Sequence, residues 1–437
     1  MLNHTLSRAC AALIAIPLIF AACISKSPVT GNTPLTSTSR ASTSAFDIRS
    51  CIEYLASDAL EGRGTGTEGE RLAGAYIVKQ FQEMKLSPGG AAGFYQEYSY
   101  VPKNPAQIHQ VGDSTKLGMG YAKEVKTRNV MAFLDNGAAT TVVIGAHYDH
   151  LGYGDENSLW TGERAIHNGA DDNASGVACM LALAEWLSKK PANTRNNNYL
   201  FIAFSGEEKG LFGSNHFTKN PTIDVKTINY MLNMDMVGRL KDNKLAVNGS
   251  GTSTEWVSEL PKIALTGIEP VFSESGVGPS DHTSFYYLDL PVLHFFTGQH
   301  EDYHKPSDDV DKINFTGIQR TVDYIGAIIT AVDGKGKLHF QKTKDATPQA
   351  ADFKVTLGVM PDYMYSGKGL KLDGTKEGRP GQKAGMLKGD ILLRLGDIEI
   401  EDIYVYMEAL GKFNKGDKTK AVVDRNGEKI TLDVVFE

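Results

Sequence analysis

Histidine and acidic side chains follow two apolar runs in the middle of this chain. The run that begins at Val142 ends in His147-Tyr148-Asp149-His150, and the run that begins at Leu200 leads to Glu207-Glu208. Imidazole and carboxylate groups are common Zn²⁺ ligands. Adjacent carboxylates repel each other, so the Glu207-Glu208 pair indicates a nearby cation. One glutamate can bind metal while the other accepts a proton from a water molecule.

Three more acidic or histidine-bearing positions extend this pattern. Asp171-Asp172 precedes a helical stretch and could supply an N-cap, but capping would not explain the small residues around it, which would let the backbone approach an ion. Asp235 ends another apolar run, where an unpaired carboxylate is costly. His304 lies in a polar loop. Together these positions indicate a metal site.

Asp149 stands two residues after His147. Side chains two apart on a strand point the same way, so the Asp149 carboxylate is expected to lie against His147 and fix its tautomer. The sequence assigns no site role to the other histidines near these motifs, which are expected in loops or the core: His150, His167, His294 and His300.

Apolar runs alternate with amphipathic segments at a spacing that predicts an α/β fold with a mostly parallel central sheet and helices on both faces. In such sheets ligands bind beyond the carboxyl ends of the strands, where the polar clusters fall. The helix expected over residues 68–84 has Leu72, Ala75, Tyr76, Phe81 and Met84 available for a buried stripe. Strands are expected at 96–100, 129–134, 142–147, 200–204, 229–236 and 291–296, and helices at 47–57, 174–188, 211–217, 255–265, 281–288 and 315–332. The glycine-rich stretch Gly62 to Thr67 is expected to be a loop.

The chain has 437 residues, which favours two domains. Its net charge of -7 argues against nucleic acid as a partner. Cys51 and Cys179 are expected to be buried free thiols.

The N-terminal segment predicts export. Residues 1–23 resemble a lipoprotein-type signal peptide, with small residues before Cys23, which would carry a lipid anchor to a bacterial membrane, facing the periplasm or the cell surface. The alternative is an ordinary signal peptide and a periplasmic or secreted protein. Residues 24–45 are Ser/Thr-rich and are expected to form a flexible tether. Residues 46–333 form the first predicted domain, 334–351 a linker and 352–437 a second domain.

The motifs HYDH, GADDNASG, SGEE, NMD and YHKPSD resemble those of the co-catalytic di-zinc exopeptidases, which include bacterial leucyl aminopeptidases and are related to glutaminyl cyclases. The resemblance covers residues 46–333. It implies two Zn²⁺ per subunit, with Asp172 bridging both ions. It also implies Glu207 as general base, Asp149 as support for His147, and Tyr303 as a contact to the scissile carbonyl. The implied metal ligands are His147, Asp172, Glu208, Asp235 and His304.

Residues 354–437 resemble a bacterial PDZ domain. The resemblance implies that the loop Leu357-Gly358-Val359 binds the C-terminal carboxylate of a peptide, which adds to the edge of a sheet. The alternative is a unit that only packs against the enzyme.

These features lead to the expectation of a zinc aminopeptidase that acts on peptides with a free N-terminus. Two alternatives stay open: another reaction on the same fold, such as carboxypeptidase action or glutaminyl cyclisation, and an inactive peptide-binding protein that works through the PDZ domain.

Overall fold

The computed structural model describes residues 46–101, 124–343 and 355–437, except residues 363, 364, 366, 376, 377 and 402. The predicted signal peptide at residues 1–23, with Cys23, and the predicted tether at 24–45 lie outside the described residues.

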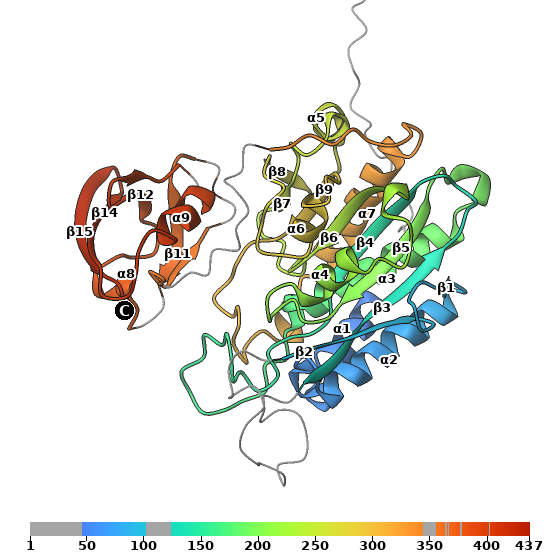
Figure 1. Cartoon of the computed structure of the whole chain (residues 1–437), viewed down its shortest axis with the longest axis horizontal. Coiled ribbons are helices and arrows are strands. Elements are labelled where there is room, and N and C mark those ends of the chain that lie inside the picture. The colour runs from blue at the N-terminus through green and yellow to red at the C-terminus, as the bar shows by residue number, and fades with distance from the viewer. Residues whose placement is uncertain are drawn as a thin grey trace, which may run out of the picture. The chain divides into compact units, whose positions relative to one another are not determined.

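A nine-stranded mixed sheet forms the centre of the first domain (Figure 1). The strand order is β1-β3-β5-β4-β6-β9-β7-β8, and β2 also pairs with β3. The central strands β5, β4, β6 and β9 are parallel, whereas β3 and β7 join them antiparallel. The mostly parallel sheet was therefore predicted correctly for its centre and not for its two ends. The strands are β1 (Ser87–Pro88), β2 (Tyr95–Tyr100), β3 (Val125–Leu134), β4 (Thr141–His147), β5 (Asn198–Phe204), β6 (Ile228–Met234), β7 (Lys244–Asn248), β8 (Glu269–Ser273) and β9 (Val292–Phe296).

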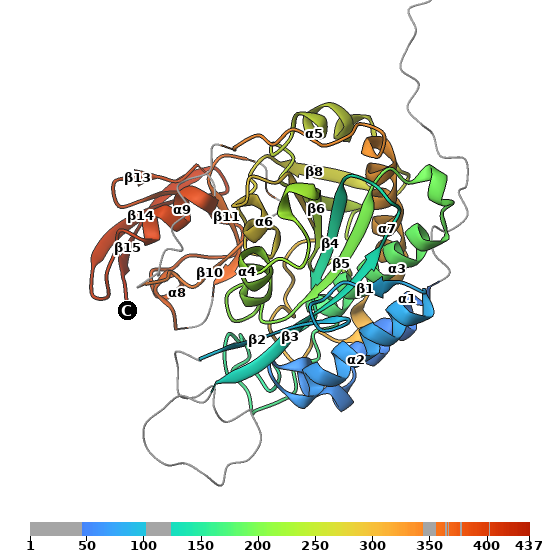
Figure 2. The same ribbon diagram turned by 45° about the vertical axis from the view of Figure 1, so that its right-hand side comes forward.

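Helices cover both faces of this sheet, as the sequence predicted (Figure 2). One face packs against α1 (Ile48–Leu55), α2 (Glu68–Glu83), α3 (Gly176–Lys189), α5 (Thr254–Glu259) and α7 (Phe315–Val332). The other face packs against α4 (Phe212–Lys219) and α6 (His282–Tyr286). The two central strands β4 and β5 are buried along their whole length, because each is covered on both sides.

Helix α2 matches its predicted range, but its buried face differs from the predicted stripe. Ala73, Ile77 and Phe81 are buried at helical spacing, whereas Ala75 is exposed. Gly74 sits on the buried face, where a Cβ atom would meet side chains of Val130 and Tyr148. Small residues therefore set the closest approach of this helix to the sheet.

The first domain continues past its predicted end at Asp333. Residues 335–343, which were expected to belong to a linker, run along the domain. Leu338 is 4% exposed and its N–H donates to Asn229. Gln341 N–H donates to the carbonyl of Thr252, and Thr343 N–H donates to Tyr286. Leu338 and Phe340 are apolar and gain burial here, which a free linker would not provide.

The second domain has a six-stranded sheet with its own core. The strand order is β10-β11-β12-β14-β15, with β13 paired to β12. The strands are β10 (Val359–Pro361), β11 (Leu370–Thr375), β12 (Ile391–Leu395), β13 (Ile398–Glu399), β14 (Lys418–Arg425) and β15 (Glu428–Val435), and the helices are α8 (Pro380–Lys383) and α9 (Ile403–Leu410). Asn426 and Gly427, both with positive φ, form the tight turn between β14 and β15.

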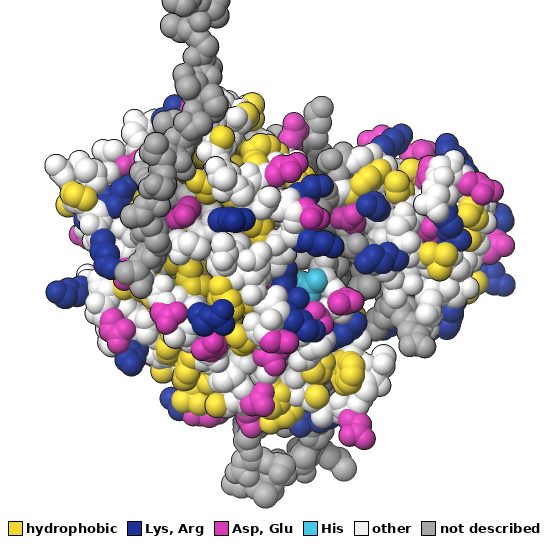
Figure 3. Space-filling view, turned by 180° about the vertical axis from the view of Figure 1, so that it is seen from behind, with side chains coloured by type: hydrophobic (Ala, Val, Ile, Leu, Met, Phe, Trp, Pro, Cys, Tyr) yellow, Lys and Arg dark blue, Asp and Glu magenta, His cyan; other side chains and the backbone are white. Residues whose placement is uncertain are grey.

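The surface carries both signs of charge. On the face drawn in Figure 3, acidic and basic side chains are interspersed. Among the helices described, none has the length and hydropathy that a membrane span requires. Cys51 and Cys179 are buried and unpaired, as predicted.

Candidate metal centre

The five predicted metal ligands come together at one edge of the central sheet. His147 is the last residue of β4, and Asp235 directly follows β6. Glu208 follows β5, Asp172 lies in the turn that leads into α3, and His304 lies in the loop after β9. Because β4, β5, β6 and β9 are parallel, their carboxyl ends share an edge, and residues far apart in sequence meet there.

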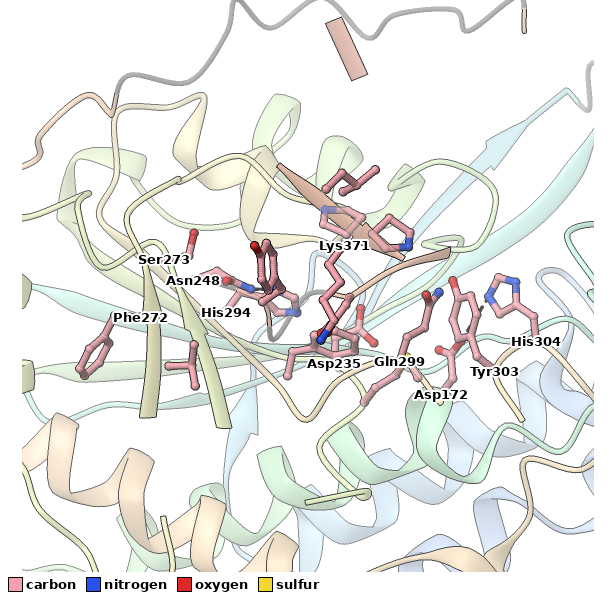
Figure 4. Close-up of a pocket in the computed structure, with 18 of the residues that line it drawn as sticks. Asp172, Asp235, Asn248, Phe272, Ser273, His294, Gln299, Tyr303, His304 and Lys371 are labelled. Carbon is pink, nitrogen blue, oxygen red and sulfur yellow. Dashed lines mark hydrogen bonds and ion pairs between the residues drawn. The ribbon is translucent and has the colours of Figure 1, made fainter. Parts of the chain in front are cut away.

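These five side chains form two groups that share Asp172. His147 Nε2 lies 3.3 Å from Asp172 Oδ1 and 3.3 Å from Asp235 Oδ1. His304 Nε2 lies 3.3 Å from Asp172 Oδ2 and 3.3 Å from Glu208 Oε2. Figure 4 shows Asp172 beside His304, with Asp235 nearby. We call His147, Asp172 and Asp235 the first cluster, and Asp172, Glu208 and His304 the second cluster.

Backbone carbonyls fix the tautomer of both histidines. His147 Nδ1–H donates to the carbonyl oxygen of Asp149 at 3.1 Å, and His304 Nδ1–H donates to the carbonyl oxygen of Asn157 at 2.8 Å. When either ring is neutral, its Nε2 lone pair therefore points into its cluster. This is the orientation that a metal ligand needs.

Asp149 acts differently from the sequence prediction. Its carboxylate lies 3.8 Å from His147 Nδ1, too far for a hydrogen bond, and it is the Asp149 backbone carbonyl that holds the ring. The carboxylate instead accepts from the Thr65 hydroxyl at 2.7 Å and from the Glu207 N–H at 3.2 Å. The backbone carbonyl of Asp149 therefore orients the His147 ring. The carboxylate of Asp149 holds the backbone N–H of Glu207.

Glu207 belongs to neither cluster but lines the same pocket as both. Burial raises the pKa of Glu207 well above its ordinary value, and although His147 opposes this, the carboxylates of Asp235 and Glu208 raise it further. A carboxyl group with a raised pKa can exchange a proton near neutral pH more readily than one with an ordinary pKa.

The pKa is lowered, not raised, in two of the predicted ligands, Glu208 and Asp172. Burial acts to raise the pKa of Glu208, but His304 and His150 together outweigh it and lower the pKa to about 2. Burial also acts against ionised Asp172, yet the pKa of Asp172 is lowered well below its usual range by His150, His147 and His304. These carboxylates are therefore ionised and ready to act as ligands.

His150 belongs to this centre, contrary to the sequence prediction. Its Nδ1 lies 2.8 Å from Glu208 Oε1 and 3.9 Å from Asp172 Oδ2. The group of His150, Asp172 and Glu208 has the spacing of a metal site, as does the first cluster. The signal was present in the sequence, because His150 follows His147 and Asp149 at the end of the same strand.

A network of charged groups holds the Asp172 turn in place. Asp308 Oδ2 accepts from the N–H groups of Asp171 and Asp172, and Asp308 Oδ1 lies 3.1 Å from Arg239. Asp171 accepts from Gly238 N–H and from His300. Asp171 thus supports the turn and is not a member of either cluster.

The glycine at the start of this turn serves packing. Gly169 has φ 57°, and a Cβ atom there would lie 2.1 Å from the carbonyl oxygen of Asp172 and 2.5 Å from the His150 ring. The sequence interpretation was that small residues let the backbone approach an ion. At Gly169 the absence of a side chain instead lets the backbone of the turn approach the Asp172 carbonyl and the His150 ring.

The glycine-rich stretch from Gly62 to Thr67 is a loop, as predicted, and it also supports the site. Arg63 is 1% exposed and donates to four backbone carbonyls. The acceptors are Tyr148 at 3.0 Å, Leu55 at 2.5 Å, Asn168 at 2.6 Å and Gly169 at 3.0 Å. Arg63 therefore ties the segment after His147 to the segment before Asp172.

Tyr303 and Asp281 lie near the clusters. The Tyr303 ring stacks on His304 with centroids 3.8 Å apart, and Tyr303 lines the pocket. Asp281 is fully buried, and its charge acts on Glu207. Neither residue is a member of a cluster.

The donor chemistry fits zinc. Each cluster offers carboxylate oxygens and an imidazole nitrogen, which are hard-to-borderline ligands. Four carboxylates, including Glu207, line one pocket, and a bound cation would offset their mutual repulsion. Among the described residues, the first cluster and the His150–Asp172–Glu208 group are the two groups with metal-site spacing.

Asn157 links two ligands of the second cluster. Its carbonyl accepts from His304 Nδ1, and its side-chain Nδ2 donates to the backbone carbonyl of Glu208 at 2.7 Å. Asn157 has φ 57°, so Asn157→Gly keeps the backbone and removes only the side-chain bond. We expect this variant to bind zinc about tenfold more weakly, the lower end of the range for residues that support metal ligands.

Isothermal titration calorimetry with Zn²⁺ tests this prediction. Asn426→Gly is the matched control, because Asn426 has φ 56° and lies in the β14–β15 turn of the second domain. Equal zinc affinity in the Asn157→Gly variant and the control would contradict the role of Asn157.

The chain is similar to known peptidases. Residues 129–329 match the sequence model of Peptidase family M28. The chain is 28% identical over 222 residues to Aminopeptidase YwaD of Bacillus subtilis, covering 48% of this chain and 45% of that protein. It is 30% identical over 202 residues to the alkaline phosphatase isozyme conversion protein of Escherichia coli. This match covers 46% of this chain and 53% of that protein. The chain thus spans about half the length of these curated relatives.

A solved structure shows the same fold. The zinc aminopeptidase BSAP from Bacillus subtilis aligns over 69% of this chain and 99% of its own, with a TM-score of 0.50 and 19% identity. The first domain therefore has a zinc exopeptidase fold.

Proposed function

We propose that this chain is a zinc-dependent aminopeptidase that removes N-terminal residues from peptides. The observation that carries the proposal is the sharing of Asp172. One of its oxygens faces His147 and the other faces His304, each at 3.3 Å, so a single carboxylate serves two adjacent ligand clusters. The match to Peptidase family M28 and the aminopeptidases among the relatives support it.

In this proposal the first cluster and the second cluster each hold one zinc ion. When bound, the ions would polarise the substrate carbonyl and make a water molecule more acidic. Glu207 accepts the proton of the attacking water and passes it to the leaving amine. Asp149 holds the Glu207 backbone for this step, and Tyr303 contacts the carbonyl oxygen from its place beside His304. The substrate's free amine is bound by nearby carboxylates.

The test is hydrolysis of leucyl-p-nitroanilide and a panel of other aminoacyl-p-nitroanilides, each beside its N-acetylated form. We expect turnover of the free-amine substrates alone, loss of activity with a chelator, and recovery on adding zinc. Zinc binding without turnover of any free-amine substrate would contradict aminopeptidase action, and carboxy-terminal cleavage and glutaminyl cyclisation would be assayed next.

The second domain and the N-terminus enter the proposal as well. The loop Leu357-Gly358-Val359 binds a peptide C-terminus in the manner of a PDZ domain, and Cys23 carries a lipid that holds the exported protein at a bacterial membrane. In support of the first point, β10 is the edge strand of its sheet among the described strands. Affinity of the full chain for peptides with free and amidated C-termini tests the peptide site.

A further inference from the structure

A row of polar side chains crosses the sheet next to the first cluster. Asn233 on β6 pairs in register with His294 on β9, which pairs with Asn248 on β7. Residues paired in register point to the same face of a sheet. Asp235 comes two residues after Asn233, about 7 Å further along the chain. The charges of Asp235 and His147 both act on His294, so the row lies close to the first cluster.

His294 and Asn248 line the pocket that holds the clusters (Figure 4). The same pocket is lined by His147, Asp235 and Glu207. A substrate bound at the clusters would share this pocket with His294 and Asn248. The apolar side chains in this part of the lining include Met236, Phe272 and Phe296.

The Nε2–H group of His294 is a donor without a hydrogen-bond partner among the described residues. Asn248 Nδ2 donates to His294 Nδ1 at 3.2 Å, since an amide nitrogen cannot accept. Burial lowers the pKa of His294 to about 4, so the ring is neutral near pH 7 and carries its proton on Nε2. The side chain is 4% exposed, and Nε2 has no hydrogen-bond partner among the described residues.

The ring of His294 is held in place from one side. His282 stacks against it with ring centroids 4.5 Å apart and an interplanar angle of 15°. The Nε2–H donor is therefore fixed in direction. A buried donor without a partner costs about 1–3 kcal/mol, so a ligand that supplies an acceptor gains affinity.

We propose that His294 and Asn248 form a specificity subsite that selects a first substrate residue with an uncharged polar side chain, such as asparagine or threonine. This inference rests on the proposed aminopeptidase function. A neutral donor suits an amide or hydroxyl oxygen. A carboxylate would lose its hydration near the acidic first cluster, and an aliphatic side chain would leave Nε2 unpaired.

Isosteric substrate pairs test the subsite. Asparagine and leucine have the same branched shape, as do threonine and valine, so each pair differs in hydrogen bonding. We expect kcat/KM for asparaginyl-p-nitroanilide to exceed that for leucyl-p-nitroanilide by about tenfold. In His294→Leu the order reverses, because the donor is gone. His339→Leu, at an exposed histidine, is the matched control and keeps the wild-type order.

A second measurement separates the subsite from the reaction. Calorimetry on the zinc-loaded protein compares the α-hydroxamates of L-asparagine and L-leucine. Tighter binding of the asparagine compound, lost in His294→Leu, supports the subsite even if no substrate is hydrolysed. Equal affinity for the two compounds overturns it, as does a wild-type preference for leucyl-p-nitroanilide.

Discussion

Glu207→Gln is expected to lower kcat by about 10²- to 10⁴-fold, the range that general acid–base catalysis contributes. The amide keeps the size and hydrogen-bonding shape of the carboxylate but cannot accept the proton of the attacking water. Glu207 lies outside both ligand clusters, so zinc content is expected to stay at the wild-type level. Steady-state kinetics with leucyl-p-nitroanilide and metal analysis by mass spectrometry measure the two quantities on the same sample.

Glu97→Gln provides the matched control, because Glu97 is exposed on β2. This variant is expected to keep wild-type kcat. A wild-type kcat in Glu207→Gln would remove Glu207 from its role as general base. Loss of zinc together with activity would instead assign Glu207 to the metal site.

Arg63→Met is expected to lower the free energy of unfolding of the first domain by at least about 4 kcal/mol, since each of four buried carbonyls left without a partner costs about 1–3 kcal/mol. Arg63 serves four such carbonyls, and methionine fills part of the space without replacing any donor. The variant is also expected to bind zinc more weakly, because Tyr148 and Gly169 flank the ligand segments.

Urea unfolding followed by tryptophan fluorescence measures this change in the full chain. All three tryptophans lie in the first domain, at positions 160, 186 and 256, so the signal reports that domain. Arg71→Met is the control, since Arg71 is exposed and pairs with Glu68 on the surface of α2. Its effect is expected to stay within about 0.5 kcal/mol. Equal unfolding midpoints for the two variants would show that the Arg63 contacts add little stability.

The sequence predicted the parts of this molecule that have a local signal. Helix α7 and the strands β4, β5 and β9 were expected at nearly their observed ranges, because long apolar runs and caps mark them. The five expected ligands meet at one edge because each follows a central strand or starts a helix. Strand direction has no such local signal, so the antiparallel ends of the sheet were not predicted. The short strands β7 and β8, at one end of the sheet, were also not predicted.

The supporting residues were harder to find for a related reason. Apart from the bond between Arg63 and Leu55, the bonds that Arg63, Asn157 and Asp308 make to support the site join residues 51 to 147 positions apart in the chain. Their acceptors or donors are largely backbone groups, which carry no residue-specific pattern. His150 was different, since it stood beside two recognised residues, and it was set aside because lone histidines are usually structural. Its contact with Glu208 depends on how β4 and β5 pair, and only the structure shows that.

The placement of Asp172 makes the two proposed zinc sites thermodynamically linked. Its backbone is held by Asp308, and its one carboxylate faces both clusters. Filling one site would hold that carboxylate in place for the other, whereas repulsion between the two cations would oppose the second binding event. Reciprocity requires that each ion change the affinity for the other by the same factor. Zinc titrations of this protein would therefore follow a coupled two-site isotherm, and loss of Asp172 would weaken both binding events together.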